Sequence, residues 1–272
     1  MTPPTPATQP TPRVAPVESW TASQVDTALS AANAALSPLS RNQDQPWRVR
    51  CTPAGIEFYA VPHEPLTTAP NGQDVLLACG AALCNVKIAL RATGVYPDVR
   101  IFPVPTRPDF LAIVRPAGAR PATQTDQELA AAITQLHTLP DTVDPLPLPV
   151  PATVRGRLQA AAEAERAWLA ILRPEHLPTW HALQQRTHQI DTTTSTTHTS
   201  TGGAAEPLIT VIGTLRDGLL TRVQAGQATQ RVLLTATLAG LSAVVRVPIC
   251  RSELRTLVGG GLWPHTVLHL GS

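Results

Sequence analysis

Residues 78–101 read ACGAALCNVKIALRATGVYPDVRI, and residues 224–247 read QAGQATQRVLLTATLAGLSAVVRV. When Gly80 is aligned with Gly226, an offset of 226 − 80 = 146, the stretches share a second glycine and an apolar-Arg-apolar triplet. The aligned pairs include Ala82 with Ala228, Val86 with Val232, Ile88 with Leu234, Gly94 with Gly240, and Val99-Arg100-Ile101 with Val245-Arg246-Val247. This agreement favours an internal duplication over chance similarity.

Each copy has the pattern of a buried helix followed by a short strand. The helical part is apolar on nearly all sides, which is typical of a helix inside a core. The glycine that closes it, Gly94 or Gly240, suits a left-handed C-cap, and β-branched residues follow. We therefore expect two central helices that pack against each other, each leading into a strand.

The stretches upstream of the two helices are also alike. Val25, Leu29, Ala31 and Ala32 have the spacing of Val154, Leu158, Ala160 and Ala161, an offset of 129. Each predicted helix leads to a Trp-containing segment, at 45–50 and 167–172, and then to a predicted strand, at 56–62 and 208–214. The sequence therefore predicts an α+β chain whose two similar halves form a fused pseudo-dimer around a shared core.

Composition and charge narrow the classes of function. The chain has 272 residues, 43% of them hydrophobic and 15% charged, with a formal net charge of +2. That basic excess is too small for nucleic-acid binding as a main activity, and apolar runs interrupted by Arg, Thr and Gln predict no membrane span. Because the N-terminus lacks the pattern of a secretory signal, we expect a cytoplasmic protein.

The domain organisation follows from composition shifts. Residues 1–18 are rich in Pro and Thr and predict a disordered tail. Residues 19–127 form the predicted first half and residues 128–272 the second, within which the Thr-rich stretch 188–206 predicts a flexible loop. Because the tandem halves supply both sides of a shared crevice, we expect a monomer, and a homodimer that covers apolar surface left by the shortened second half is the alternative.

A polar segment after the first helix is the main candidate for ligand binding. It contains Ser40, Gln43 and Gln45 and ends at Trp47. Its amides and hydroxyl have the chemistry that binds a planar polar ligand. A helix C-cap and turn that only satisfy the backbone explain the same residues, so both interpretations stay open.

The pattern SxxxxQPWRxR at 40–50 and the run CGAALxNxxxALRxxGxxPxVR from Cys79 resemble the Acg type of the nitroreductase superfamily. The stretch VIGTLRDGLLTRVQAGQATQRVLLTATLAGLSA at 211–243 is similar to the same family. The resemblance covers most of the chain and implies a nitroreductase-like three-layer fold with two fused halves. It also implies FMN in a crevice between them, with a single flavin site.

The resemblance assigns cofactor-binding roles by position. Ser40, Gln43 and Gln45 would face the isoalloxazine ring, with Trp47 packed behind it. The turn Gly240-Leu241-Ser242 would offer backbone groups from the other half. His137 and Thr138 match the family's Arg-Arg-His-Thr segment, which is expected to bind the FMN phosphate. No catalytic side chain and no metal site is assigned.

Two departures from the family bear on the cofactor. Gln43 stands where the family usually has Asn. The phosphate-binding segment reads Gln135-Leu136-His137-Thr138, so both of its arginines are missing. Because charge-assisted hydrogen bonds to phosphate contribute about 1.5–3 kcal/mol each, their loss weakens FMN binding unless another cation replaces them. The candidate replacements are Arg48, Arg216, Arg222 and His137.

The family matches and the missing arginines together leave two functions open. The first is an FMN-dependent NAD(P)H oxidoreductase of nitroreductase type, which reduces a small nitroaromatic or quinone-like acceptor. The second is a catalytically inactive, flavin-poor relative that binds or sequesters flavin. The family resemblance favours the first function, and the missing arginines favour the second.

Overall fold

The computed structural model describes residues 19–35, 45–61, 72–138, 149–190, 208–248 and 250–271 and has the mixed α+β architecture expected from the sequence. Two four-stranded antiparallel sheets form its frame. The first has the order β1 (Trp47–Thr52), β2 (Gly55–Ala60), β4 (Phe110–Ala119), β3 (Val95–Ile101). The second has the order β5 (Trp168–Ile171), β6 (Leu208–Thr214), β8 (Trp263–Gly271), β7 (Ser242–Arg246).

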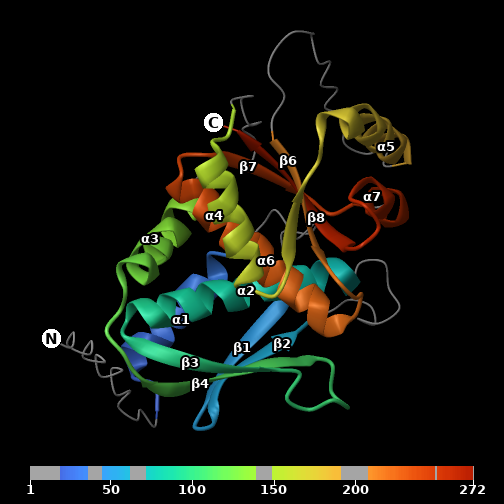
Figure 1. Ribbon diagram of the computed structural model, residues 1–272. Coiled ribbons are helices and arrows are strands. Elements are labelled where there is room, and N and C mark those ends of the chain that lie inside the picture. The colour runs from blue at the N-terminus through green and yellow to red at the C-terminus, as the bar shows by residue number, and fades with distance from the viewer. Residues whose placement is uncertain are drawn as a thin grey trace, which may run out of the picture.

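The helices lie between and around these sheets, with α2 and α6 in the middle (Figure 1). Their bounds are α1 Ala22–Asn33, α2 Gly72–Ala92, α3 Gln124–Thr138, α4 Ala152–Glu163, α5 Leu177–Ile190, α6 Leu219–Leu238 and α7 Arg251–Leu257, with a 3-10 turn at Pro174–His176. The predicted central helices and the predicted strands at 56–62, 99–101, 208–214 and 245–247 are therefore confirmed, with small shifts at their ends.

Both central helices end in the glycine turn that the sequence predicts. Gly94 has φ +82° and Gly240 has φ +70°, which lie in the left-handed region that favours glycine. After α6, the amide of Leu241 donates to the carbonyl oxygen of Ala236 at 2.9 Å, so the turn closes on the last helical carbonyls. Each turn then directs the chain into an edge strand, β3 or β7.

The two central helices touch through backbone rather than through side chains. A Cβ on Gly80 would overlap the carbonyl oxygen of Val223, and a Cβ on Gly226 would overlap that of Leu77. These are the two glycines that the sequence alignment pairs. Farther along, Gln230 bonds Asn85, so the contacts advance along both helices in the same direction. Only glycine permits this approach, which makes the crossing the tightest point of the core.

One hydrophobic cluster joins both sheets through this crossing. It contains Phe58 and Leu111 of the first sheet and Leu268 of the second, together with residues of α2 and α6, and these side chains are almost fully buried. Within α2, the segment Asp74–Ala92 is long and apolar enough to cross a membrane, which the interrupted apolar runs did not predict. Because 78% of it is buried inside the structure, it has the surroundings of a core helix.

A polar ladder crosses the same interface. Asn85 is fully buried and donates to the carbonyl oxygen of Ala31 in α1 at 3.1 Å. Gln230 of α6 donates to the Asn85 side-chain oxygen at 3.0 Å. Each group therefore has a partner, and since a buried amide without one costs about 1–3 kcal/mol, the ladder specifies how α1, α2 and α6 align.

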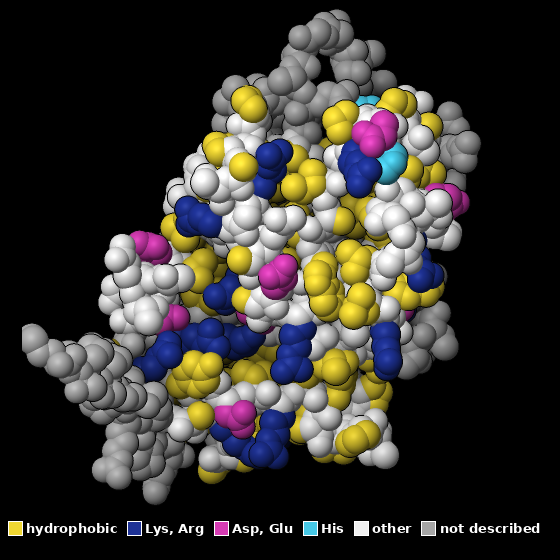
Figure 2. Space-filling model, viewed as in Figure 1, with side chains coloured by type: hydrophobic (Ala, Val, Ile, Leu, Met, Phe, Trp, Pro, Cys, Tyr) yellow, Lys and Arg dark blue, Asp and Glu magenta, His cyan; other side chains and the backbone are white. Residues whose placement is uncertain are grey.

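A buried ion cluster fixes the other side of the crossing. The ammonium of Lys87, the single lysine of the sequence, bonds the carboxylate of Glu165 and the side-chain oxygen of Gln227. Arg231 of α6 bonds the second carboxylate oxygen of Glu165 at 3.3 Å. Glu165 is 6% exposed and lies in the short turn between α4 and β5, next to Arg166 with φ +61°. On the face of the molecule that Figure 2 shows, a band of Lys and Arg side chains lies near the level of α2.

The predicted domain organisation stays a prediction. Residues 1–18 lie outside the described residues. Of the predicted loop 188–206, residues 188–190 belong to α5 and the remainder lies outside the described residues. The helix α3 runs across residues 127 and 128, where the two halves were expected to meet.

We predict that Gly226→Ala destabilises the protein by at least about 2 kcal/mol, because the new methyl group must push the α2 backbone away. Gly156→Ala in α4 is the matched control, since nothing lies within 4 Å of a Cβ there and alanine favours a helix by about 0.5–1 kcal/mol. Thermal melts of the purified variants should show opposite shifts. Equal melts for Gly226→Ala and the wild type would contradict the tight crossing.

We predict that Glu165→Gln lowers the free energy of unfolding by about 3 kcal/mol, because Lys87 and Arg231 lose their shared counter-ion in a buried setting. Glu175→Gln is the control, since its pair with Arg173 is exposed and such pairs contribute about 0–1 kcal/mol. Urea unfolding of both variants measures the difference. Similar midpoints would mean that the buried cluster contributes no more than a surface pair.

Candidate functional site

The predicted flavin-binding residues lie in three segments that are far apart in the sequence. Ser40 and Gln43 lie outside the described residues. Gln45 is exposed directly before β1, and its Nε2 donates to Oδ1 of Asn33, the last residue of α1, at 3.3 Å. This hydrogen bond links the residues just before β1 to the C-terminal end of α1.

Trp47 begins β1 and pairs with Ala60 of β2. It is 5% exposed and packs in the main hydrophobic cluster. Its indole Nε1 is buried and has no hydrogen-bond partner among the described residues. A buried donor without a partner is uncommon in proteins, and the indole nitrogen of Trp180 is a second example among the described residues.

The turn at Gly240, Leu241 and Ser242 forms the second segment. Gly240 is exposed, and nothing lies within 4 Å of the position a Cβ would take. Leu241 is half-buried and packs against the main cluster, and Ser242 opens β7 opposite Gly271. The backbone at Gly240 is therefore open to an approaching ligand, while Leu241 offers an apolar surface.

The third segment is the end of α3, where His137 and Thr138 occupy the last positions of the helix. Leu136 packs against a small buried cluster made by α2, α3 and α6. Ala34 from the end of α1 and Leu238 from the end of α6 pack against the same cluster. The structure thus brings together the C-terminal ends of three helices that carry or adjoin the predicted residues.

At the position where the resemblance implies a phosphate-binding arginine, the chain has a partly buried leucine. Leu136 stands where the resemblance implies the second arginine, and it contacts both the main cluster and the small cluster. Gln135 stands at the first arginine and is exposed. An arginine at 136 would have to enter apolar surroundings, so restoring both arginines would disturb the packing as well as add charge.

Three of the four candidate replacement cations lie in the wrong place. Arg48 is exposed and, as the neighbour of buried Trp47 on a strand, points to the opposite face of the sheet. Arg222 lies in the first turn of α6, eighteen residues before Gly240, which is about 27 Å along the helix. Arg216 precedes it and is farther away. Of the four, only His137 is close in sequence to the converging helix ends.

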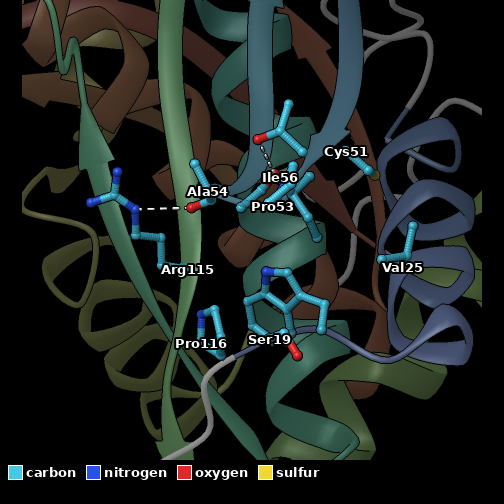
Figure 3. Close-up of a pocket in the computed structure, with 11 residues that line it drawn as sticks. Ser19, Val25, Cys51, Pro53, Ala54, Ile56, Arg115 and Pro116 are labelled. Carbon is cyan, nitrogen blue, oxygen red and sulfur yellow. Dashed lines mark hydrogen bonds between the residues drawn. The ribbon is translucent and has the colours of Figure 1, made fainter.

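Two pockets lie among the described residues, and the second is lined in part by Ala34 and Ile133 of the small cluster. One, of about 250 Å³, lies at the β1–β2 hairpin between Trp20, Cys51 and Pro116 (Figure 3). There Arg115 Nε donates to the carbonyl oxygen of Ala54 at 3.0 Å. The other, of about 470 Å³, is an open groove along α1, α2 and α3 with a largely alanine floor. Neither contains Gln45, Trp47 or the Gly240 turn.

No family model matches the chain. Two proteins of Mycobacterium tuberculosis are similar to it, "Putative NAD(P)H nitroreductase MT3217" of strain CDC 1551 / Oshkosh and "Putative NAD(P)H nitroreductase Rv3131" of strain H37Rv. Each is 27% identical over 281 residues, which cover 85% of this chain and 81% of the relative. The chain is a distant relative of these nitroreductases. Its mixed helices and sheets are consistent with a nitroreductase-like fold.

A polar network that sequence reasoning missed occupies the opposite end of α6. His265 of β8 is fully buried, and its Nε2 lies 2.7 Å from the hydroxyl oxygen of Thr214. That hydroxyl donates to the carbonyl oxygen of Arg216, so the imidazole Nε2–H donates to Thr214. The Nδ1 atom then accepts from Arg251 Nη2 at 3.3 Å. Burial and the charge of Arg251 lower the pKa of His265 to about 3.

Asp217 completes this network by bridging two guanidinium groups. It accepts from Arg222 at 2.9 and 3.2 Å and from Arg251 at 3.1 Å. Although burial raises the pKa of Asp217, the hydrogen bond from Arg222 and the charge of Arg251 lower it to about 2. Arg222 is therefore engaged as a structural partner. The spacing of five residues between Asp217 and Arg222 could have indicated their ion pair from the sequence. The contacts of Arg251 and His265 join residues far apart in the chain and have no such local signal.

We predict that this network makes the protein sensitive to acid. The pKa of His265 is lower in the folded than in the unfolded state, so the unfolded state gains a proton first as the pH falls from about 6.5 to 3. Stability should therefore fall by up to about 1.4 kcal/mol per pH unit in this window, with Asp217 adding to the loss between about 3.8 and 2. Urea unfolding at several pH values measures this slope.

The control for this prediction is His176→Gln, which changes a histidine outside the network. His265→Gln should flatten the pH dependence between about 6.5 and 4, and His176→Gln should leave it unchanged. An unchanged slope in His265→Gln would contradict the assignment.

Proposed function

We propose that this chain is a flavin-dependent NAD(P)H oxidoreductase of nitroreductase type, with FMN as its family cofactor. The observation that carries the proposal is that the ends of α1, α3 and α6 pack around one cluster, which brings together segments that carry or adjoin the residues assigned to the flavin. The names of the two M. tuberculosis relatives support the same class of reaction.

In this proposal the residues of the chain bind and orient the ring. When bound, a flavin supplies the hydride transfer from NAD(P)H to a small nitroaromatic or quinone-like acceptor. Trp47 donates a hydrogen bond or packs behind the ring, Leu241 contacts its apolar part, and the open backbone at Gly240 permits close approach. Ser40, Gln43 and Gln45 are proposed to face the ring edge.

We also propose that the chain is a fused pseudo-dimer of the Acg type, acting as a cytoplasmic monomer. Supporting observations are the equal strand orders of the two sheets and the mutual contact of the aligned residues Gly80 and Gly226. Trp47 and Trp168 also begin equivalent edge strands, β1 and β5. A chain that supplies both sides of the crevice needs no second copy to form the site.

A second candidate function is a catalytically inactive protein that binds or sequesters flavin. It is favoured by the packing of Leu136 into the core where the resemblance implies a phosphate-binding arginine. In this alternative the chain keeps the residues proposed to bind the ring, but the bound flavin passes no electrons to an acceptor.

We predict that the protein purified after expression with added riboflavin is yellow and consumes NADH or NADPH with 1,4-benzoquinone or nitrofurazone as the acceptor. Leu241→Asp should lose the visible flavin absorption, because a carboxylate would replace an apolar contact. Leu220→Asp is the control, since Leu220 is 46% exposed in the first turn of α6, far from Gly240.

Two outcomes decide between the candidates. Flavin absorption without NAD(P)H consumption for either acceptor would favour the binding protein. A colourless protein that also fails to quench added flavin would contradict both functions.

A further inference from the structure

Two arginines lie against one exposed tyrosine at the end of the first central helix. Tyr96 follows the Gly94 turn as the second residue of β3 and is 40% exposed. The guanidinium carbons of Arg91 and Arg120 lie 4.8 and 5.4 Å from the centre of its ring. The amide of Arg120 donates to the carbonyl oxygen of Gly94 at 2.8 Å, which fixes the end of β4 beside the start of β3. The fold therefore holds two cations at one aromatic ring, and we call Arg91, Tyr96 and Arg120 the Tyr96 cluster.

One carboxylate faces both guanidinium groups, and it is already engaged. Burial raises the pKa of Asp126, but hydrogen bonds from Thr123 and the charges of the two arginines lower it. Its Oδ2 accepts from the Thr123 hydroxyl at 2.6 Å and from the Thr123 amide at 3.0 Å, in the capping box that begins α3. The same oxygen lies 3.7 Å from Arg120 Nη2, which is an ion pair beyond hydrogen-bond distance. Asp126 therefore balances one positive charge of the Tyr96 cluster and leaves the other.

The neighbouring ion cluster on α2 also has more cations than carboxylates. Lys87 and Arg231 share the single carboxylate of Glu165. Burial raises the pKa of the Cys84 thiol to about 12, and the charges that act on this thiol include those of Glu165, Lys87, Arg231 and Arg91. The ion cluster and the Tyr96 cluster are therefore within electrostatic range of each other. Together they contain four cations and two carboxylates, a surplus of 4 − 2 = 2 positive charges among the described residues.

The guanidinium groups of the Tyr96 cluster can be reached from solvent. The Arg120 side chain is 40% exposed, and among the described residues its guanidinium makes no hydrogen bond. Arg91 uses Nη2 for one long hydrogen bond of 3.4 Å to the Tyr96 hydroxyl oxygen. Figure 2 shows Lys and Arg side chains at the surface near the level of α2, the helix that carries Arg91. Two guanidinium groups and a surplus of two charges fit a phosphate dianion, because its oxygens accept paired, charge-assisted hydrogen bonds.

We propose that the Tyr96 cluster is a binding site for a phosphate group, either free or on a small molecule. Arg91 and Arg120 donate to the phosphate oxygens, and the ring of Tyr96 keeps the two guanidinium groups in place. This site goes beyond the proposed function and does not depend on a flavin. Asp126 and His137 are eleven residues apart on α3, so about 16 Å of helix separates the cluster from the segment assigned to the flavin.

The test is calorimetric titration of the purified full chain with AMP, inorganic phosphate and adenosine. AMP and phosphate should bind and adenosine should not, and the affinity for AMP should fall at least fivefold between about 0.02 and 0.3 M salt, because exposed charges are screened. Tighter binding of AMP than of phosphate would identify an organic phosphate as the ligand, and equal binding would identify the free ion. No binding of either at about 5 mM, or equal binding of adenosine and AMP, would overturn the inference.

A matched pair of variants tests the residues. Arg120→Gln removes one guanidinium from a partly exposed position and should weaken AMP binding at least tenfold. Arg100→Gln is the control, because Arg100 is an exposed arginine of β3 that lies 3.8 Å from Asp98, and it should leave AMP binding unchanged. Thermal melts should show that both variants fold like the wild type. Equal losses in the two variants would mean a diffuse charge effect and would overturn the site.

Added riboflavin separates this site from the proposed flavin site. Riboflavin has no phosphate, so it should leave the affinity of the chain for AMP unchanged. Competition between riboflavin and AMP would place both ligands at one site and contradict the inference.

Discussion

The contact between the α2 and α6 backbones at Gly80 and Gly226 is the constraint on which the rest of the structure depends. Without side chains at this point the helices approach until backbone atoms meet, and each sheet then packs on its own helix. The close approach also brings Asn85 to Gln230 and Lys87 to Gln227. Because these polar groups are buried, any other register would leave them without partners, at a cost of about 1–3 kcal/mol each.

This arrangement divides the polar chemistry of the molecule between the two ends of α6. At the N-terminal end, Asp217 and His265 hold arginines in a hydrogen-bonded network. At the C-terminal end, Gly240 is exposed and Leu238 packs against the small apolar cluster. A helix of this length keeps the two regions about 30 Å apart, so charges at one end have little influence on a ligand at the other.

The sequence predicted the parts of the fold that depend on local pattern. The paired glycines, the apolar helices and the β-branched strands that follow them are all visible within short windows, and the structure has them where expected. The sequence did not predict the hydrogen bond of Gln45 to Asn33 at the end of α1. Ser40 and Gln43 lie outside the described residues, so their proposed contacts stay predictions.

What the sequence could not predict depends on contacts between distant residues. The salt bridge of Lys87 with Glu165 and the hydrogen bond of Arg251 with His265 have no local signature. The packing of Leu136 is a further case, because the sequence pattern alone does not show whether a leucine near a helix end faces solvent or the core. Only the placement of α3 on α2 and α6 decides it.

The two connections that follow α1 and α4 have very different lengths, although they lead to strands with the same place in their sheets. One runs from residue 34 to 46, and the other only from 164 to 167, where Glu165 turns inward. In a symmetric homodimer any change to such a connection would occur twice. A single chain can change the length of one connection without changing the other, and here the shorter one carries the buried carboxylate that binds Lys87.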